Sequence, residues 1–384
     1  MENGLPVGWQ RKRLDQIADF LDGQRKPIKE GDRQSIQGEY PYYGASGIID
    51  YVNDYLFDDE LILLGEDGAN IVNRSSPLAF RVSGKCWVNN HAHVIKPKPG
   101  TEIDFLVEYL ESLDYSGLNS GTAQPKLNLA SCQSIPVLVP PVEEQKVIAA
   151  VLSTWELGIR QLTYLIAAKV RFKQGLMQQL LTGKRRFPAF KDDWKHVRIG
   201  DVAREVSERN PDGDSIPVLS CTKYDGLVDS LEYFGKRVFS ENTDNYKVVR
   251  RDDFAYATNH IEEGSIGLLR HADAGLVSPM YTVFRTNGDI DPEYLYRVLK
   301  TETLRQVFAS FTSASVNRRG SLRWKQFSTI PLELPGIDEQ SYINKAMMAF
   351  DREVELLRKQ LEALKQQKKG LMQKLLTGEV RVKL

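Results

Sequence analysis

The feature that most constrains this chain is an internal repeat. Residues 175–183 (GLMQQLLTG) return as residues 370–378 (GLMQKLLTG), with one substitution, 195 positions further on. The same offset relates Glu144-Gln145 to Glu339-Gln340 without a gap, so roughly fifty residues are in register. A repeat of this length constrains the architecture more strongly than any local pattern, and it predicts two copies of one structural plan.

A second pair of matching segments opens the two halves of the chain. Residues 9–18 (WQRKRLDQIA) match residues 194–203 (WKHVRIGDVA) at an offset of 185. The segments between these landmarks match poorly. Even so, residues 61–64 and 254–257 have the pattern of equivalent strands, as do residues 93–95 and 282–284. We therefore expect a common frame with divergent inserts, which suggests two recognition surfaces with different targets.

The repeated segment has the pattern of a long helix. Pro140 and Pro335 end the preceding strand, and Gly183 and Gly378 can take the left-handed conformation that ends a helix. Between them apolar residues recur alternately every four and three positions. A stripe of period 3.5 over more than four heptads predicts a coiled-coil seam, about 48 Å long at about 1.5 Å per residue. The alternative is two separate helices, each buried in its own domain.

The predicted seam of the first copy is Ile148, Leu152, Trp155, Ile159, Leu162, Ile166, Lys169, Lys173, Leu176 and Leu180. The predicted seam of the second copy is Ile343, Met347, Phe350, Val354, Leu357, Leu361, Leu364, Lys368, Leu371 and Leu375. Gly175 and Gly370 lie inside these helices at matching places, where each costs about 1 kcal/mol relative to alanine. Either close approach of another backbone or inheritance from the duplication would explain them.

Connectivity predicts how the halves are arranged. If a pseudo-twofold axis relates them, the second helix runs antiparallel to the first and ends near Trp9. The expected fold is α+β, with two mixed α/β domains joined by two long antiparallel coiled-coil helices. The expected boundaries are 1–141 for the first domain, 142–183 for the first helix, 184–336 for the second domain and 337–384 for the second helix. Residues 104–112 and 292–301 are expected to form one helix within each insert.

Composition sets broad limits on function. Lys plus Arg equals Asp plus Glu at 51 each, so no overall basic field indicates nucleic acid, although a basic face could be balanced by acids elsewhere. The three cysteines are far apart with no CxxC motif, which is typical of a reducing compartment and not of a disulfide framework or zinc ribbon. The sequence shows neither a signal-peptide core near its start nor an apolar run of membrane length. We expect a soluble, cytoplasmic protein with no membrane partner.

The chain resembles the specificity subunit of type I restriction-modification systems over essentially its whole length. The resemblance rests on the repeated I-P-x-x-x-P-x-x-E/D-E-Q segment, the L-x-x-x-L-L-T-G helix end and the W-x-x-x-x-L/I-x-x-I/V-A opening of each half. It implies two target recognition domains that each read half of an asymmetric, bipartite target in double-stranded DNA, with the helices as a ruler across the spacer. It also implies docking of two modification (methyltransferase) subunits and of restriction subunits that are ATP-dependent translocases and nucleases. S-adenosylmethionine, ATP and Mg are then expected on those partners and no cofactor on this chain.

Candidate DNA contacts follow from side-chain chemistry, since Arg and Lys suit phosphates and guanine while Asn and Gln suit adenine. A basic stretch surrounds Trp324, for which a solvated charge run is the alternative explanation. The full set of candidates is Tyr42, Tyr43, Ser46, Arg74, Asn89, Asn90, His91, His93, Gln124, Lys126, Lys223, Tyr224, Asn259, His260, Arg318, Arg319, Arg323 and Lys325.

Other chemistries are less favoured. An amino-methyltransferase loop has the form [DNS]-P-P-[YFW], and residues 278–281 (SPMY) lack its second proline, so entry into a strand is the better interpretation. His91 and His93, with Cys86 upstream, could bind a metal, but a fourth ligand is missing and no metal site is predicted. A non-enzymatic coiled-coil scaffold with two divergent ligand- or protein-binding end domains is the alternative function. That alternative does not explain why the frame repeats while the inserts diverge.

Overall fold

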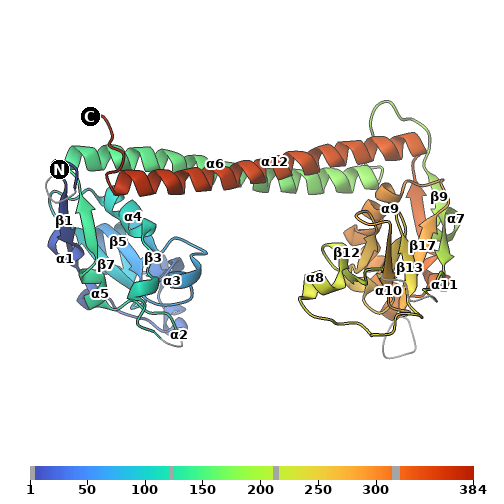
Figure 1. The fold of residues 1–384 in the computed structure, drawn as a ribbon, viewed down its shortest axis with the longest axis horizontal. Helices are drawn as coiled ribbons and strands as arrows, with labels where there is room; N and C mark the ends of the chain where they lie inside the picture. The colour runs from blue at the N-terminus through green and yellow to red at the C-terminus, as the bar shows by residue number, and fades with distance from the viewer. Residues whose placement is uncertain (1–4, 122–123, 211–215, 314–320) are drawn as a thin grey trace. The chain divides into compact units, whose positions relative to one another are not determined.

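The computed structural model describes residues 5–121, 124–210, 216–313 and 321–384. It divides into two compact units, the first comprising residues 1–165 and 357–384 and the second residues 166–356. The chain passes from the first unit to the second within helix α6 (Val142–Leu181) and returns within helix α12 (Ile337–Leu376) (Figure 1). None of the helices in the described part of the chain combines the length and apolar character needed to cross a membrane.

A mixed six-stranded sheet organises the first unit, in the order β2-β7-β5-β6-β3-β4. Its pairings are antiparallel except for β3 with β6. Four successive residues of β5, 61–64, are fully buried because both faces of the sheet are covered there. The elements are β1 (Gln10–Arg13), α1 (Leu14–Ile17), β2 (Ala18–Phe20), α2 (Glu30–Arg33), β3 (Gln37–Gly44), β4 (Gly47–Val52), β5 (Phe57–Gly65), α3 (Asn70–Asn73), β6 (Ala79–Val88), β7 (Ala92–Pro97), α4 (Ile103–Ser112), α5 (Leu129–Gln133) and β8 (Pro136–Val139).

The second unit contains a four-stranded sheet in the order β10-β17-β14-β15 and three separate strand pairs, β9-β18, β11-β12 and β13-β16. Its core is aromatic: the rings of Phe254 and Phe284 stack at 4.7 Å, and the ring of Phe327 lies 4.8 Å from that of Tyr256. The elements are β9 (Lys195–Arg198), α7 (Ile199–Val202), β10 (Ala203–Val206), β11 (Leu219–Thr222), β12 (Gly226–Asp229), α8 (Ser230–Phe234), β13 (Lys247–Arg250), β14 (Phe254–Ala257), β15 (Ile266–Leu268), β16 (Ala274–Val277), β17 (Tyr281–Thr286), α9 (Pro292–Leu299), α10 (Glu302–Ser313), α11 (Trp324–Phe327) and β18 (Pro331–Leu334).

The two units repeat one frame. The order β2-β7-β5-β6 in the first unit corresponds to β10-β17-β14-β15 in the second, which confirms the predicted equivalence of β5 with β14 and of β7 with β17. The opening strand of each half pairs with the strand before the long helix, β1 with β8 and β9 with β18. The predicted insert helices are also present as α4 and α9. The additions to the frame differ, because β3 and β4 extend only the first unit's sheet while the second unit has the separate hairpin β11-β12.

The repeated Glu-Gln pair explains how each long helix is attached. In the first unit the Glu144 carboxylate accepts hydrogen bonds from the indole of Trp9 at 3.1 Å and the guanidinium of Arg381 at 2.6 Å. In the second unit Glu339 accepts from Trp194 at 3.3 Å and Arg186 at 2.8 Å. The following glutamines, 145 and 340, each donate to a proline carbonyl five residues back, at 2.8 and 2.9 Å. The same set of contacts therefore fixes the start of both helices.

Helices α6 and α12 run antiparallel within each unit. In the first unit Lys368 of α12 pairs with Glu156 of α6 at 3.0 Å. In the second unit Lys173 of α6 pairs with Asp351 of α12, and the residues of this pair stand 195 positions from those of the first. Every residue of the predicted seam is buried or half-buried, whereas Tyr164 on the opposite face of α6 is 68% exposed.

Glycines end both long helices as expected. Gly183 and Gly378 have φ values of 66° and 75°, in the left-handed region. A Cβ on Gly378 would lie 3.5 Å from the ring of Trp9, so α12 ends beside Trp9, as the connectivity predicts. The idea that another backbone approaches Gly175 and Gly370 is wrong, because nothing in the described residues would lie within 4 Å of a Cβ at either position.

The core position of Leu152 gives a test of this packing. Leu152 on α6 is fully buried in the core of the first unit, so Leu152→Ala should lower the free energy of unfolding by about 2–5 kcal/mol. Leu157, on the same helix but 44% exposed, is the matched control, and Leu157→Ala should change it by less than about 0.5 kcal/mol. Urea denaturation of the full chain measures both. Equal losses would show that Leu152 does not occupy a core position.

Candidate nucleic-acid interface

Three loops of the first unit meet at one edge of its sheet. The loop after β5 contacts the turn between β6 and β7, because the Glu66 nitrogen donates to the His91 carbonyl at 2.9 Å. It also contacts the loop before α5, because the Leu127 nitrogen donates to the Glu66 carbonyl at 2.7 Å. We call this edge the first rim and define it by Glu66, Asp67, Asn90, His91 and Lys126.

The second unit has the corresponding edge. The Leu322 nitrogen donates to the Thr258 carbonyl at 2.8 Å, and Leu322 stands 195 positions after Leu127. The Thr258 hydroxyl donates to the Met280 carbonyl at 3.2 Å, which joins the loop after β14 to the turn before β17. We call this edge the second rim and define it by Thr258, Asn259, Met280, Arg323 and Lys325. All five residues of the second rim line one cavity of about 1090 Å³.

Eight of the residues predicted to contact DNA lie at these two rims. Asn90, His91 and Lys126 are exposed on the first rim, with Gln124 in the same loop as Lys126. Exposed Ser46 lies beside them, because the Ala45 carbonyl would be 2.7 Å from a Cβ on Gly65. The rest are on the second rim, where Asn259 is half-buried and Arg323 and Lys325 are exposed. Residues far apart in the sequence thus share one edge in each unit.

Three predicted contacts are buried instead, which corrects the expectation for them. Tyr42 is 1% exposed, and its hydroxyl accepts a hydrogen bond from the Ile28 nitrogen at 2.9 Å. The Asn89 side chain accepts from the His91 nitrogen at 2.8 Å and so shapes the turn that carries His91. The third buried residue is His93, which is described below. Tyr43, a further candidate, is only half-buried, and burial raises the pKa of its hydroxyl.

His93 is a buried cation. Its Nδ1 lies 2.6 Å from an Asp22 carboxylate oxygen and its Nε2 lies 3.1 Å from the Leu127 carbonyl. Both partners accept, so both ring nitrogens donate and the ring is protonated. Burial, the largest single effect, lowers the pKa of His93, but the hydrogen bonds and charge interactions with Asp22 and Cys132 together outweigh it and raise the pKa to about 10. Burial alone would raise the pKa of Asp22, and the hydrogen bonds from His93 and Val94 lower it instead.

The residues around His93 do not suit a metal ion. Asp22, Glu66 and His93 offer three ligand atoms near one another, but the Arg25 guanidinium already pairs with both acids, at 3.3 and 2.7 Å. A protonated imidazole has no lone pair for a metal. His91 points elsewhere and pairs with Asp67 at 2.8 Å. The two histidines of the H-x-H pattern therefore have separate structural roles.

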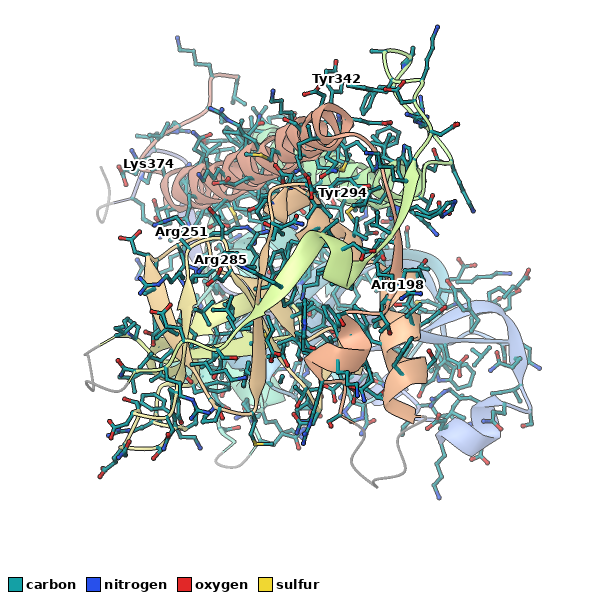
Figure 2. All side chains as sticks on the ribbon, turned by 90° about the vertical axis from the view of Figure 1, so that its right-hand side faces the viewer. Arg198, Arg251, Arg285, Tyr294, Tyr342 and Lys374 are labelled. Atoms are coloured by element: carbon teal, nitrogen blue, oxygen red, sulfur yellow. The ribbon has the colours of Figure 1, made fainter. Side chains whose placement is uncertain are left out.

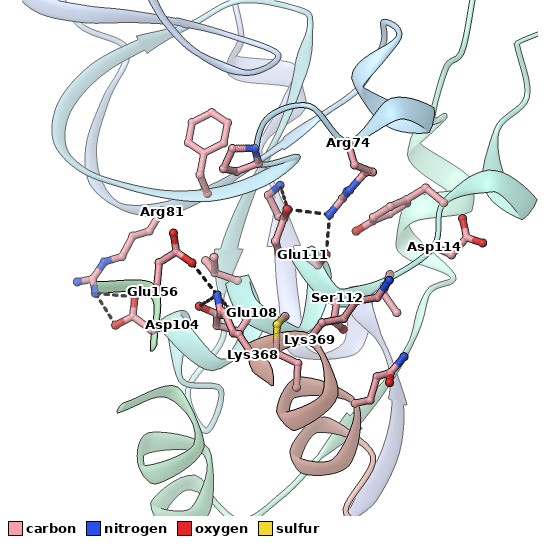
Figure 3. Close-up of a pocket in the computed structure, with 18 of the residues that line it drawn as sticks. Arg74, Arg81, Asp104, Glu108, Glu111, Ser112, Asp114, Glu156, Lys368 and Lys369 are labelled. Atoms are coloured by element: carbon pink, nitrogen blue, oxygen red, sulfur yellow. Dashed lines mark hydrogen bonds and ion pairs between the residues drawn. The ribbon is translucent and has the colours of Figure 1, made fainter. Parts of the chain in front are cut away.

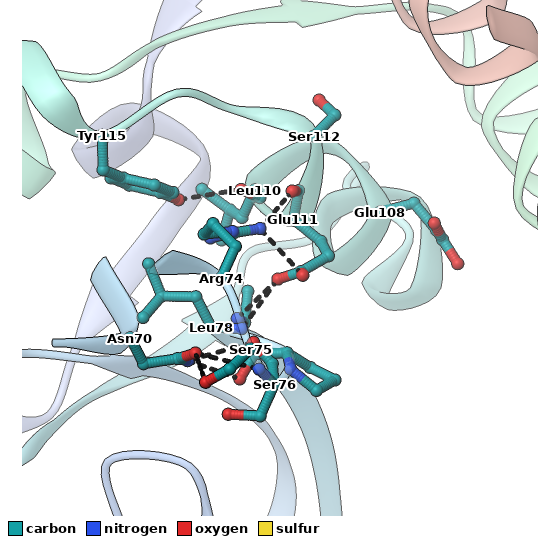
Figure 4. A network of polar contacts seen from close by, with 12 residues as sticks. Asn70, Arg74, Ser75, Ser76, Leu78, Glu108, Leu110, Glu111, Ser112 and Tyr115 are labelled. Carbon is teal, nitrogen blue, oxygen red and sulfur yellow. Dashed lines mark hydrogen bonds and ion pairs between the residues drawn. The ribbon is translucent and has the colours of Figure 1, made fainter. Parts of the chain in front are cut away.

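Arg74 lies away from the first rim, and its contact with DNA stays a prediction. It lines a cavity of about 1020 Å³ between α4 and the paired segments of α6 and α12 in the first unit (Figure 3). Its guanidinium pairs with Glu111 at 2.8 Å and lies 5.8 Å from the ring centre of Tyr115 (Figure 4). Glu111 also accepts from the nitrogens of Leu78 and Ala79. Arg74 therefore holds the end of α3 against α4.

The remaining candidates of the second unit are more scattered. Lys223 and the 81% exposed Tyr224 form the β11-β12 turn and do not line the cavity of the second rim. His260 follows Asn259 and lies 3.4 Å from Glu263. Arg318 and Arg319 lie outside the described residues.

Two arginines of the second unit have acidic partners, whereas the two cations of the second rim have none among the described residues. Arg285 pairs with the buried Asp253 at 2.9 Å, and Arg251 pairs with Asp273 at 2.8 Å; both arginines lie over the strands of this unit (Figure 2). In the described part of the chain, by contrast, no acid pairs with Arg323 or Lys325. These two cations are free to meet a ligand.

Sequence reasoning missed Lys247. It lines the cavity of the second rim and donates to the Tyr281 carbonyl at 2.7 Å. Burial lowers the pKa of its ammonium group. Lys247 opens strand β13 (KVVR), whose apolar residues indicate a core strand and give no sign that the lysine faces a cavity.

Comparison with known proteins is consistent with this arrangement. Residues 6–166 and 191–366 match the family model described as type I restriction modification DNA specificity domain. The MjaVIII type I restriction enzyme specificity subunit of Methanocaldococcus jannaschii is 24% identical over 99% of this chain and 94% of its own length. A putative type I restriction enzyme specificity subunit of Haemophilus influenzae is 38% identical, but that match spans 39% of this chain and 37% of the relative.

Two solved structures share the fold. The S subunit of a type I restriction-modification system from M. genitalium superposes with a TM-score of 0.56 at 15% identity, over 97% of each chain. An HsdS subunit from Thermoanaerobacter tengcongensis superposes with a TM-score of 0.54 at 16% identity, over 99% of this chain and all of the other.

The assignment of His93 as a core cation can be tested by substitution. His93→Gln should lower the free energy of unfolding at pH 7 by about 3 kcal/mol, because Asp22 would lose its closest cationic partner. The exposed neighbour His91 is the control, and His91→Gln should cost less than about 0.5 kcal/mol. Because the folded-state pKa is raised, the difference between wild type and His93→Gln should be full below pH 6.5 and vanish as pH rises through about 10. Urea denaturation across this range measures it, and a pH-independent difference would contradict the assignment.

Proposed function

The chain belongs to the type I restriction-modification DNA specificity family, and on that premise we propose that it recognises an asymmetric, bipartite target in double-stranded DNA. In this proposal each unit is a target recognition domain, 1–141 and 184–336, that reads one half of the target. The segments 142–183 and 337–384 form the spacer between the halves. The repeated attachment of both helices through Glu144 and Glu339 supports a spacer built from two equivalent parts.

The observation that carries the proposal is the pair of rims. Both rims lie at the same edge of the same strand order. In each, a leucine nitrogen donates a backbone hydrogen bond to the loop after β5 or β14, and the two leucines stand 195 positions apart, yet the side chains of the rims differ. Asn90 and Asn259 can bond the adenine edge, and Arg323 can bond guanine or phosphate. Unlike side chains at equivalent positions are what two different half-sites require. A scaffold with two unrelated ligands gives no reason for this chemistry to recur at the same edge.

The proposed partners follow from the family. Two modification subunits that methylate adenine with S-adenosylmethionine would dock on this chain, together with restriction subunits that use ATP and Mg. We assign recognition to this chain and the chemical steps to those partners. The segment 278–281, considered above as a methyltransferase loop, is a turn that leads into β17, which favours its structural interpretation.

Exchange of one insert tests the proposal. Residues 21–134 would be replaced by the equivalent segment of a relative with a known, different target, and the assembled modification complex would be used to map methylated adenines. One half of the methylated motif should change while the other half and the spacer length stay the same. The reciprocal exchange of residues 206–328 is the matched control and should change the other half alone. A motif that changes throughout, or not at all, would contradict one half-site per unit.

A further inference from the structure

The two rims differ in whether their cationic side chains have acidic partners. On the first rim Lys126 pairs with Glu66 at 3.2 Å, and His91 lies 2.8 Å from Asp67. Glu66 is largely buried and also holds Arg25 at 2.7 Å, so its carboxylate is fixed in place beneath the rim. Lys26 borders this rim, since its nitrogen donates to the Val88 carbonyl at 3.3 Å, and it adds one further cation.

The second rim presents cations without such partners. Arg323 and Lys325 are exposed on either side of Trp324, and within the described residues neither has an acidic partner. The nearby Lys247 bonds the Tyr281 carbonyl and not a carboxylate. Among the described residues that line this cavity, Glu205 is the one acid. In the sequence, Arg318 and Arg319 lie shortly before Arg323, whereas residues 113–125 before Lys126 include no lysine or arginine.

We propose that the two units divide DNA binding unequally: the second rim supplies most of the sequence-independent contact with phosphates, and the first rim contributes mainly base recognition. This inference rests on the proposed function, because it concerns the same two surfaces. The second unit would hold the complex on a duplex of any sequence. The first unit would then distinguish target from non-target sequences along that duplex.

The physical basis is the cost of exchanging partners. A cation that meets a phosphate releases a counterion from the DNA, which is the main source of affinity in sequence-independent binding. A free cation such as Lys325 gains this in full. Lys126 must first leave Glu66, which would keep Arg25 but lose its second cationic partner, so the exchange returns less. The acids of the first rim also repel phosphates, while Asp67 can accept from the amino group of cytosine.

Substitutions that remove positive charge, made as matched pairs on the two rims, test this unequal division of DNA binding. The two double variants are Arg323→Gln with Lys325→Gln on the second rim and Lys26→Gln with Lys126→Gln on the first. Each would be assembled with modification subunits and titrated with a duplex that lacks the target, at several salt concentrations. The slope of log K against log salt is negative, and its magnitude should fall by about 2 for the second-rim variant, at about 0.9 per phosphate contact. For the first-rim variant it should fall by no more than about 1.5, because Lys126 pairs with Glu66 while Lys26 has no acidic partner among the described residues.

Further variants serve as controls. Arg251→Gln removes an exposed arginine at the opposite end of β14, where it pairs with Asp273, and should leave the slope unchanged. Single Lys325→Gln and Lys126→Gln variants repeat the comparison with one surface lysine each, and the slope should fall by about 1 and by less than about 0.5 respectively.

The possible outcomes distinguish a failure of this inference from a failure of the proposed function. Equal falls in slope, or a larger fall for the first-rim variant, would overturn the division of binding while leaving two half-sites intact. An insert exchange that leaves the methylated motif unchanged, or a wild-type complex that does not bind duplex DNA, would overturn the proposed function and this inference with it.

Discussion

A buried carboxylate at the first turn of each long helix is the interaction on which the rest of each unit depends. Glu144 and Glu339 are 0% and 2% exposed, and a carboxylate in such a site is costly unless it is paired. Each is paired by the tryptophan that opens its own half and by an arginine that follows the other long helix. The helix N-terminus adds a favourable dipole. One charge thus joins the start of a unit, the start of one helix and the end of the other.

This attachment explains why the inserts are free to diverge. The strands β1 with β8 and β9 with β18 close each unit at its helix, so the frame does not rely on particular side chains at the far edge of the sheet. At that edge only backbone hydrogen bonds recur, as between Leu127 and Glu66 and between Leu322 and Thr258. Side chains can then change without loss of the fold. The paired cations of the first rim and the free cations of the second are two results of that freedom.

The errors of sequence reasoning have a common physical cause. Aromatic and polar residues near glycine-rich turns suit both ligand contact and core packing, and only the depth at which the backbone places them decides. Tyr42 follows its strand into a buried position, while Ser46 at the next turn is exposed. His93 lies two residues from the exposed His91 and is a core cation, because Asp22 and Leu127, distant in sequence, offer acceptors to both its nitrogens. Arg74 is likewise held by Glu111, which no local pattern links to it.

The sequence by itself determined the duplication, the two long helices with their ends, the core strands and the family, because repeats, periodicity and glycine or proline positions act through local backbone rules. Only the tertiary structure decided which candidates share an edge, which are buried and which cations are free. Those properties depend on contacts between segments that are far apart in the chain. The pairing of Lys126 with Glu66 and the lack of an acidic partner for Lys325 among the described residues are set by such contacts, and the charge of each rim follows from them.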